Sequence, residues 1–312
     1  MLSERHGPIL VLGAAALDIV GRPLDELQAG TSTPGSLRIS LGGVGRNVAE
    51  NLARLGSEVI LITAVGDDPQ GHELLQETAN AGVTVDHCLT IPGQPTGSYL
   101  AVLDGRGNLL HALDDMRVIE SISPEELRQR RALFQEAAVV FLDANLPARS
   151  LATALGLARR ASVPVAADPT SVALAQRLCP HLKDLWLVTP NQAESEALCY
   201  LPSVEGGRDR ALDVARWLVG EGVQIAIVSI AEYGVVYASA EGSGHVPAIQ
   251  TEIVEATGAG DALSAAVMFS LLNEIPLDEA VRLGVSAASL TLRTRGSVVP
   301  DLSLELLYEQ LR

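Results

Sequence analysis

The stretch EATGAGDAL, from Glu255 to Leu263, places a glycine turn directly before an apolar pattern of helical period. Gly258 and Gly260 permit a tight turn and a close approach of the backbone to a ligand. The unpaired amides at the start of a helix can hold an anion. However, a negative residue, Asp261, follows the turn, and the usual P-loop lysine is absent, since Lys183 is the only lysine in the chain.

An aspartate at an anion-binding turn is explained if the turn and Asp261 contact different groups of the reactants. The amides of Gly258, Ala259 and Gly260 face the oxygens of a phosphoryl group, while Asp261 faces an incoming hydroxyl and takes its proton. The alternative is an ordinary helix start with a favourable acid in its first turn. The motif alone leaves both interpretations open.

Composition limits the partners of the chain. Its 312 residues are 47% hydrophobic, 3% aromatic and carry a formal net charge of −16. An acidic surface repels nucleic acids and anionic membranes, and the few aromatic residues argue against base-stacking platforms. We therefore expect a small-molecule partner, with no nucleic acid and no membrane.

The cysteines and the N-terminal apolar run indicate the compartment. Cys88, Cys179 and Cys199 are far apart and not in metal-binding or disulfide spacing, which favours a reducing compartment. The run ILVLGAAAL (Ile9–Leu17) follows a leader with both charge signs and ends at Asp18, so it predicts a buried strand rather than a signal peptide. We expect a cytoplasmic protein.

Short apolar runs alternate with amphipathic stretches along the chain. This βαβα order predicts an α/β fold with a mostly parallel sheet covered by helices on both faces, and ligands at the carboxyl ends of its strands. The predicted strands are Ile9–Ala16, Val59–Val65, Ala138–Leu142, Val163–Ala167, Leu185–Val188 and Ile225–Ile230. The predicted helices are Gly45–Leu55, Gly71–Ala81, Arg149–Arg160 and Asp209–Val219.

Two segments interrupt this alternation. Residues 22–41 read as a loop ending in the alternating SLRISL, and residues 96–113 read as a hairpin with a GRGN turn. Together they predict either a small β flap beside one domain of residues 1–312, or two ordinary surface excursions.

The stretch LGGVGRNVAENLARLG, from Leu41 to Gly56, permits two interpretations. Gly43 and Gly45 form a partial dinucleotide fingerprint, with Asp67 placed as a ribose-binding acid, but the last glycine is missing. Alternatively, Gly42 and Gly43 present bare backbone to a polyhydroxylated ligand, with Asn47 one turn further on.

Three further groups of residues are ambiguous by themselves. Asn191 and Glu194 in VTPNQAESEAL can orient Mg²⁺ and phosphates, or form a capping box. VSIAEYGVVYA, residues 228–238, is a nucleotide-facing turn or a plain hairpin. Polar side chains at predicted strand ends can accept hydrogen bonds from sugar hydroxyls or serve as turn residues: Asp18, Asp115, Asp143, Asn145 and Asp168.

Taken together, these stretches resemble the ribokinase family, also called the phosphofructokinase-B type of carbohydrate kinases. GGVGRNVAENLARLG and EATGAGDALSAA match its two signatures in order, with VGDDPQG and TPNQAES between them. The resemblance covers nearly the whole chain. It implies a ribokinase-like three-layer sandwich with a small β lid that often pairs with the lid of a second subunit, giving a homodimer.

The resemblance also implies ATP as donor, Mg²⁺ as cofactor and a role for each matching residue. Asp261 would be the catalytic base, with an anion hole at Gly258, Ala259 and Gly260. The acceptor would contact Asp18, Gly42, Gly43 and Asn47. The nucleotide and its metal would be served by Asn191, Glu194, Ser229, Gly234 and Thr257.

The chain departs from the family pattern at two positions. Glu255 replaces the usual aspartate near the monovalent-cation loop, which bears on potassium activation. Ala231 stands in the nucleotide turn where glycine is common.

Within the family, TGSYLAVLDGRGNLLHALDDM and FLDANLP look most like pseudouridine kinases, through Asp115 and Asn145. The sequence thus predicts an ATP-dependent kinase for a primary hydroxyl, with pseudouridine as acceptor. Ribose or another nucleoside is the alternative acceptor. An NAD-dependent oxidoreductase and a non-catalytic sugar- or nucleoside-binding protein are alternatives of other classes.

Overall fold

The computed structural model describes residues 6–28, 30–104, 109–201 and 207–312. Its centre is an eight-stranded main sheet, in which six parallel strands are followed at one edge by two more strands, each antiparallel to the strand before it. In spatial order the strands are β14 (Gly242–Val246), β13 (Val235–Ser239), β12 (Ile225–Ser229), β11 (Leu187–Val188), β10 (Val165–Asp168), β9 (Val139–Asp143), β1 (Ile9–Leu12) and β4 (Val59–Ile62).

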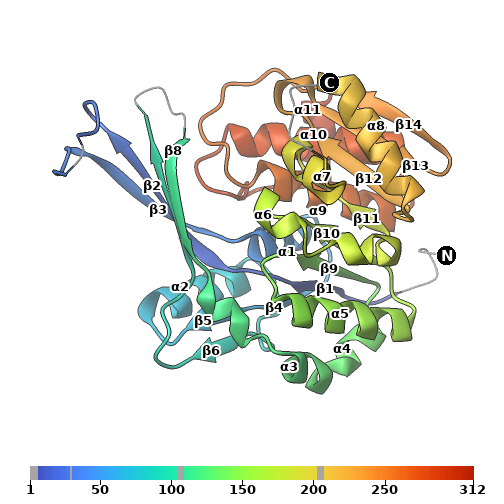
Figure 1. Cartoon of the computed structure of the whole chain (residues 1–312), viewed down its shortest axis with the longest axis horizontal. Coiled ribbons are helices and arrows are strands. Elements are labelled where there is room, and N and C mark those ends of the chain that lie inside the picture. Colours follow the sequence, from blue (N-terminus) through green and yellow to red (C-terminus); the bar gives the residue numbers. More distant parts are fainter. Residues whose placement is uncertain (1–5, 29, 105–108, 202–206) are drawn as a thin grey trace.

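Helices cover both faces of the main sheet, so the molecule has three layers (Figure 1). One face packs against α3 (Pro124–Gln129), α4 (Arg131–Glu136), α5 (Ala148–Ala161), α7 (Gln192–Leu198) and α8 (Gly207–Gly220). The other packs against α1 (Val44–Arg54), α9 (Ala259–Leu272) and α10 (Leu277–Leu292). The remaining helices are α2 (Pro69–Asn80), α6 (Val172–Ala175) and α11 (Leu304–Gln310), with 3-10 turns at Arg117–Ser121, Cys179–Asp184 and Ala231–Tyr233.

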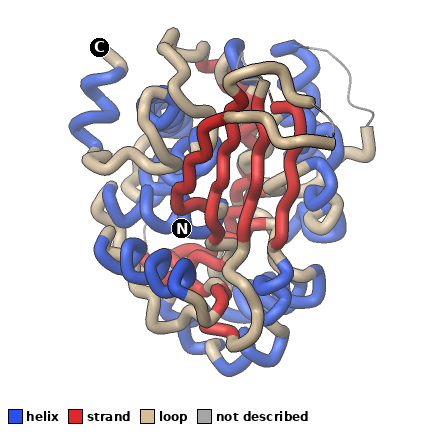
Figure 2. The backbone as a smooth tube through the Cα atoms, turned by 90° about the vertical axis from the view of Figure 1, so that its left-hand side faces the viewer, coloured by secondary structure: helices blue, strands red, loops and turns tan. Residues whose placement is uncertain are grey.

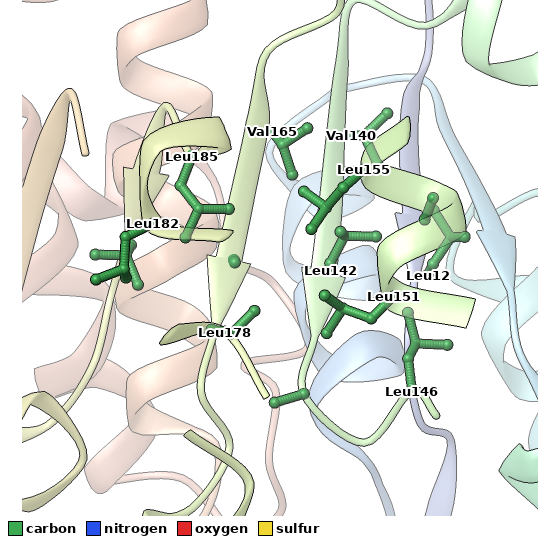
Figure 3. Packing of buried hydrophobic residues seen from close by; sticks show 14 of the residues in the cluster. Leu12, Val140, Leu142, Leu146, Leu151, Leu155, Val165, Leu178, Leu182 and Leu185 are labelled. Atoms are coloured by element: carbon green, nitrogen blue, oxygen red, sulfur yellow. The ribbon is translucent and has the colours of Figure 1, made fainter. Parts of the chain in front are cut away.

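Strand pleating divides the core between the two faces. In β1, Leu10 and Leu12 enter one apolar cluster, while Ile9 and Val11 enter the other. Figure 3 shows the first cluster, where Leu151 and Leu155 of α5 pack over the strands. Parallel strands buried on both faces read as continuous apolar runs, which is why the sequence reveals them.

A second sheet of four strands lies beside the main body, in the order β3 (Gly35–Gly42), β2 (Ala16–Pro23), β7 (Ser98–Leu103) and β8 (Leu109–Asp115). We call it the small sheet. Figure 2 shows its strands side by side at the surface of the molecule. A two-stranded sheet of β5 (Ala64–Gly66) and β6 (Leu89–Ile91) completes the strands of the described chain.

The α/β sandwich with a mostly parallel sheet is confirmed, and so is the hairpin of β7 and β8. Its predicted GRGN turn, residues 105–108, lies outside the described residues. Two predicted strands were too long: Ile9–Ala16 ends at Leu12, and Val59–Val65 divides into β4 and β5. The segment 22–41 is also less loop-like than predicted, because β3 pairs along its whole length with β2.

No helix in the described ranges combines the length and the apolar content needed to cross a bilayer.

Candidate active site

Asp261 lies in the first turn of α9, near the carboxyl ends of the central strands, and is 8% exposed. Nδ2 of Asn47, in α1, donates a 2.8 Å hydrogen bond to its Oδ2. Burial raises the pKa of Asp261 to about 7, against the lowering effect of Asn47, and the charges of Asp18, Asp143 and Glu194 raise it further. This carboxyl therefore titrates near neutral pH, as a general base requires.

The glycine turn before Asp261 has the backbone geometry of an anion site. Gly258 has φ 84° and forms the N-cap of α9. A side chain at Gly258 would also collide with the carbonyl group of Ser297, so only glycine fits here. The amides of Ala259, Gly260 and Asp261 have no helical acceptor, since they belong to the first turn. Gly258, Ala259 and Gly260 thus lie directly beside the carboxyl of Asp261.

The small sheet brings a second carboxyl to this site. Asp18 in β2 is 5% exposed, and its carboxyl packs against the Cα of Gly42, where any side chain would collide with it. Burial raises the pKa of Asp18 to about 6, the charge of Glu255 raises it further, and Arg46 and Arg38 lower it. The next residue after Gly42, Gly43, is the N-cap of α1, the helix that carries Asn47.

Asp143, at the end of β9, connects these elements and is fully buried. Its Oδ2 accepts hydrogen bonds from the amides of Ala14 (2.7 Å) and Gly45 (2.9 Å), and its Oδ1 accepts one from Asn145 (2.9 Å). Burial raises its pKa to about 6 even so. With its oxygens committed to the backbone, Asp143 fixes the start of α1 against β1 rather than binding a sugar.

Asp115 and Asn145 lie together, but on a neighbouring cavity of about 660 Å³. This cavity is bounded by the end of β8, the loop after β9, and α6 with the residues that follow it. Asp115 is bound by Nε and Nη2 of Arg117 at 2.8 and 2.6 Å, and these bonds lower its pKa to about 2. Strand register aligns Asp115 with Ser98 and Leu17, whereas Asp18 aligns with Ser40 and Tyr99. Asp115 therefore lies on the face of the small sheet opposite to Asp18.

The same register reveals two residues that the sequence did not single out. Asp18 pairs with Tyr99, which pairs with Asp114, so all three share one face. Desolvation raises the pKa of Tyr99, and the charges of Asp18 and Asp114 raise it further. Asp114 also lines the 660 Å³ cavity. A signal was present in the sequence, because strict alternation places Asp114 and Asp115 on opposite faces.

Asn191 and Glu194 form a capping box at the start of α7, and Glu194 lies close enough for its charge to act on Asp261. The Asn191 amide donates to Oε2 of Glu194 at 2.9 Å, and the Glu194 amide donates to Oδ1 of Asn191 at 3.0 Å. Burial raises the pKa of Glu194. It also raises the pKa of the neighbouring Asp168 well above its usual value, an effect that the charges of Glu194 and Asp261 reinforce.

Among the described residues, no three His, Cys, Asp or Glu side chains form a metal-binding group. Mg²⁺ usually keeps several waters and is held by one or two carboxylates together with substrate phosphates. Glu194 and Asp168 are the carboxylates of suitable chemistry here.

The predicted nucleotide residues follow the next strand. Ser229 ends β12 and forms a bridge with Asn191. Ala231, at φ 48°, and Gly234, at φ 95°, both have left-handed backbone in the turn to β13. Glycine adopts this conformation at no steric cost, so the structure explains why Ala231 is an unusual residue here. Thr257 is half-buried directly before the glycine turn.

The dinucleotide-binding alternative is wrong. A dinucleotide fingerprint needs a main-sheet strand leading into its helix, but α1 follows β3 of the small sheet. Asp67 is not a buried ribose ligand either, since its side chain is 50% exposed and lies 3.2 Å from His72.

Comparisons with known proteins identify a family and several relatives of this chain. The family model described as pfkB family carbohydrate kinase matches residues 8–303. The pseudouridine kinase of Escherichia coli strain K12 is 36% identical, over 95% of this chain and 94% of its own length. The guanosine-inosine kinase of Exiguobacterium acetylicum is 30% identical, over 94% and 97%. The structure of Arabidopsis thaliana ribokinase with ribose and ATP superposes on this chain with a TM-score of 0.83 and 21% identity, covering 98% of this chain and 99% of that one. The chain belongs to the pfkB family of carbohydrate kinases.

Proposed function

We propose that this kinase transfers the γ-phosphoryl group of ATP to the primary hydroxyl of pseudouridine, giving pseudouridine 5′-phosphate and ADP. The observation that carries the phosphoryl-transfer chemistry is the buried carboxyl of Asp261, with its pKa at about 7, beside the free amides of the glycine turn. We also propose that residues 1–312 act as one kinase domain, with the small sheet as its lid.

The proposed step involves few groups. The acceptor hydroxyl gives its proton to Oδ1 or Oδ2 of Asp261 as its oxygen attacks the γ-phosphorus. The bond from the γ-phosphorus to the β,γ-bridging oxygen breaks, and ADP leaves with that electron pair. The amides at Gly258, Ala259 and Gly260 donate to the equatorial oxygens, where negative charge is spread in the transition state.

The acceptor would lie between the small sheet and α9. Asp18 would accept hydrogen bonds from ribose hydroxyls and Asn47 would donate to them, while Gly42 and Gly43, which lack side chains, would permit close approach of the sugar. The base would occupy the adjoining 660 Å³ cavity, which Asn145 and Asp115 line together with Asp114.

Pseudouridine differs from uridine in the donors of its base. Its ring is joined to ribose through carbon, so N1 retains a hydrogen and the base has two N–H donors instead of one. A cavity with two aspartates and an asparagine offers acceptors for the additional donor. The likeness to the Escherichia coli pseudouridine kinase supports the same acceptor.

ATP would be bound on the side of the site formed by Asn191, Ser229, Gly234 and Thr257. The Arabidopsis ribokinase complex, which has the same fold, holds ATP and supports this donor. Glu194 would contact Mg²⁺ through water. When bound, this ion neutralises charge on the β- and γ-phosphates, which matters in a site that contains several carboxyls.

The outer face of the small sheet supports a homodimer as the working assembly. Register aligns Ile39, Ile19, Leu100 and Leu113 in one row across its four strands, on the face opposite to Asp18. Ile39 is 64% and Leu113 is 70% exposed. Contiguous exposed apolar side chains are typical of interaction sites, and we propose the small sheet of a second copy as the partner.

The test is ADP release with ATP and Mg²⁺ against pseudouridine, uridine, guanosine, inosine, ribose and fructose 6-phosphate. Asp261→Asn is the matched control for contaminating activity. The proposal predicts turnover that depends on Asp261 and prefers pseudouridine to uridine. Faster turnover of another acceptor would refute pseudouridine but retain the kinase chemistry. Binding of a nucleoside without any turnover would favour the non-catalytic alternative.

A further inference from the structure

An ion pair links the small sheet to the segment that leads into the glycine turn. Arg38 in β3 pairs with Glu255, three residues before Gly258. Arg38 shares the face of Ser40 and Asp18, by alternation along β3 and by register with β2. Its side chain is 38% exposed, whereas that of Glu255 is 9% exposed. The pair therefore closes the base of the acceptor site from the side of the sheet.

Three further contacts extend this link, and we call the whole set of contacts the bracket. Oε2 of Glu255 accepts a 2.9 Å hydrogen bond from the amide of Gly296. Ser297 Oγ donates at 2.8 Å to the carbonyl of Leu41, at the end of β3. The Cα of Gly258 packs against the backbone of Ser297. Side-chain and backbone contacts thus hold together the small sheet, residues 296–297 and the segment that contains the glycine turn.

The charges in this bracket are interdependent. Oε1 of Glu255 is buried and accepts no well-aligned hydrogen bond from the part of the chain that the structure describes, so the ion pair with Arg38 compensates its charge. A buried carboxylate without a compensating charge is strongly unfavourable. Arg46 is the other cation that faces Asp18, but its guanidinium pairs with Glu50. Loss of Arg38 would leave Glu255 as an uncompensated charge beside Asp18.

We propose that Arg38 and Glu255 are a positioning pair. They couple the position of the small sheet over the acceptor to the alignment of the phosphate-binding amides at Gly258–Gly260. The inference rests on the proposed function of this site. Neither residue touches the reacting atoms. Their contribution is that the sheet carrying Asp18 and the turn beside Asp261 move together as one unit.

The test is a double-mutant cycle of Arg38→Met, Glu255→Gln and the double variant. Glutamine keeps an oxygen that can accept from Gly296 but removes the charge. Each single change should lower kcat by about tenfold, because the loss of one charge-assisted hydrogen bond corresponds to a change in rate of about this size. The effect on the KM for ATP should be smaller. The double variant should be no slower than either single one. Arg38→Lys should recover part of kcat, because it restores the charge.

Arg282→Met is the control, since it removes an exposed ion pair to Asp278 within α10. It should leave kcat and the KM values unchanged. If the fold-decreases in kcat of Arg38→Met and Glu255→Gln multiply in the double variant, the two residues act independently and the proposed coupling is overturned. Thermal unfolding of each variant identifies any loss of activity that merely follows from loss of the fold.

Hydrogen exchange without substrates tests the same link independently of the acceptor. Arg38→Met should speed amide exchange in residues 255–260, and Glu255→Gln should speed exchange in β3. Faster exchange confined to the substituted segment would overturn the inference. Because this readout needs no turnover, it remains decisive even if pseudouridine is not the substrate.

Discussion

Nδ2 of Asn47 donates a 2.8 Å hydrogen bond to Oδ2 of Asp261, joining the first turns of α1 and α9 across 214 positions of sequence. The same asparagine stands next to Gly42 and Gly43, where the acceptor is proposed to bind. Asn47 therefore links acceptor binding to the ionisation of the proposed base, because a donor to a carboxylate favours its charged form.

Replacing Asp261 by Asn should lower kcat by about 10² or more, since proton removal contributes factors of this size. Asparagine is nearly isosteric, so the KM values for ATP and acceptor should change little. Steady-state kinetics with both substrates varied check this. Turnover within a few-fold of the wild-type rate would remove Asp261 as the base.

The rate should rise with pH as Asp261 loses its proton. Since its pKa is about 7, kcat/KM for the acceptor should climb through neutral pH and level off above it. Asn47→Ala removes a hydrogen-bond donor that lowers this pKa. The midpoint of the rise in kcat/KM should therefore shift to higher pH by about one pH unit. An unchanged limb in this variant would mean that another group controls the profile.

Stability should change with pH for the same reason. The pKa of Asp261 in the folded state, about 7, exceeds its ordinary value of 3.8, so its contribution to stability is complete at low pH and is lost as the pH rises through neutral. Asp261→Asn does not titrate. Its unfolding free energy relative to wild type should therefore increase between pH 5 and pH 8, by on the order of 2 kcal/mol. Chemical denaturation at both pH values measures this, and a constant difference would contradict it.

Gly258→Ala should damage both the turn and the reaction. Left-handed backbone and the carbonyl of Ser297 leave no room for a methyl group, so the turn must shift. Displacing anion-hole amides costs about 10²-fold in kcat. Gly156→Ala is the control, because nothing lies near that position in α5 and alanine favours the helix. Equal kinetics for the two variants would exclude Gly258 from the anion hole.

Glu194→Gln should raise the Mg²⁺ concentration needed for half-maximal rate. Glutamine can retain the capping contact with the Asn191 amide, so α7 should remain intact while the charge is lost. A titration of the rate with Mg²⁺ at fixed ATP measures this requirement. If the curve is the same as for wild type, Glu194 is only a helix cap.

Leu113→Glu should prevent dimerisation by placing a charge in the apolar row of the small sheet. Light scattering at several protein concentrations should show a dimer for wild type and a monomer for the variant. Val172→Glu, at a 50% exposed position of α6, is the control and should remain dimeric. Identical masses for all three proteins would place the interface elsewhere or exclude it.

Sequence patterns predicted the features that depend on local period. Strands of the main sheet are continuous apolar runs, and the start of α9 follows from its glycine turn. The boundary at Gly13 was missed because Ala14, Ala15 and Ala16 continue the apolar run of β1, although β2 belongs to another sheet.

Contacts between distant segments were beyond local patterns. The pairing of Arg38 with Glu255 depends on how β3 lies against the residues before α9, which no spacing encodes. The commitment of Asp143 to three backbone amides likewise arises only when β1, α1 and β9 come together. The resemblance to pseudouridine kinases singled out Asp115, whereas only the strand register shows that Asp114 shares the face of Asp18.

The division of the site between two sheets has a consequence for enzyme engineering. The proposed phosphoryl-transfer groups lie on α9 and after main-sheet strands, while Asp18, Tyr99 and Asp114 lie on the small sheet. Exchanging β7 and β8 for those of a relative is thus a way to change the preferred acceptor while the residues on α9 and the main sheet are retained. Such a chimera should keep Arg38 and Glu255, so that the small sheet with its exchanged strands keeps its position relative to the glycine turn.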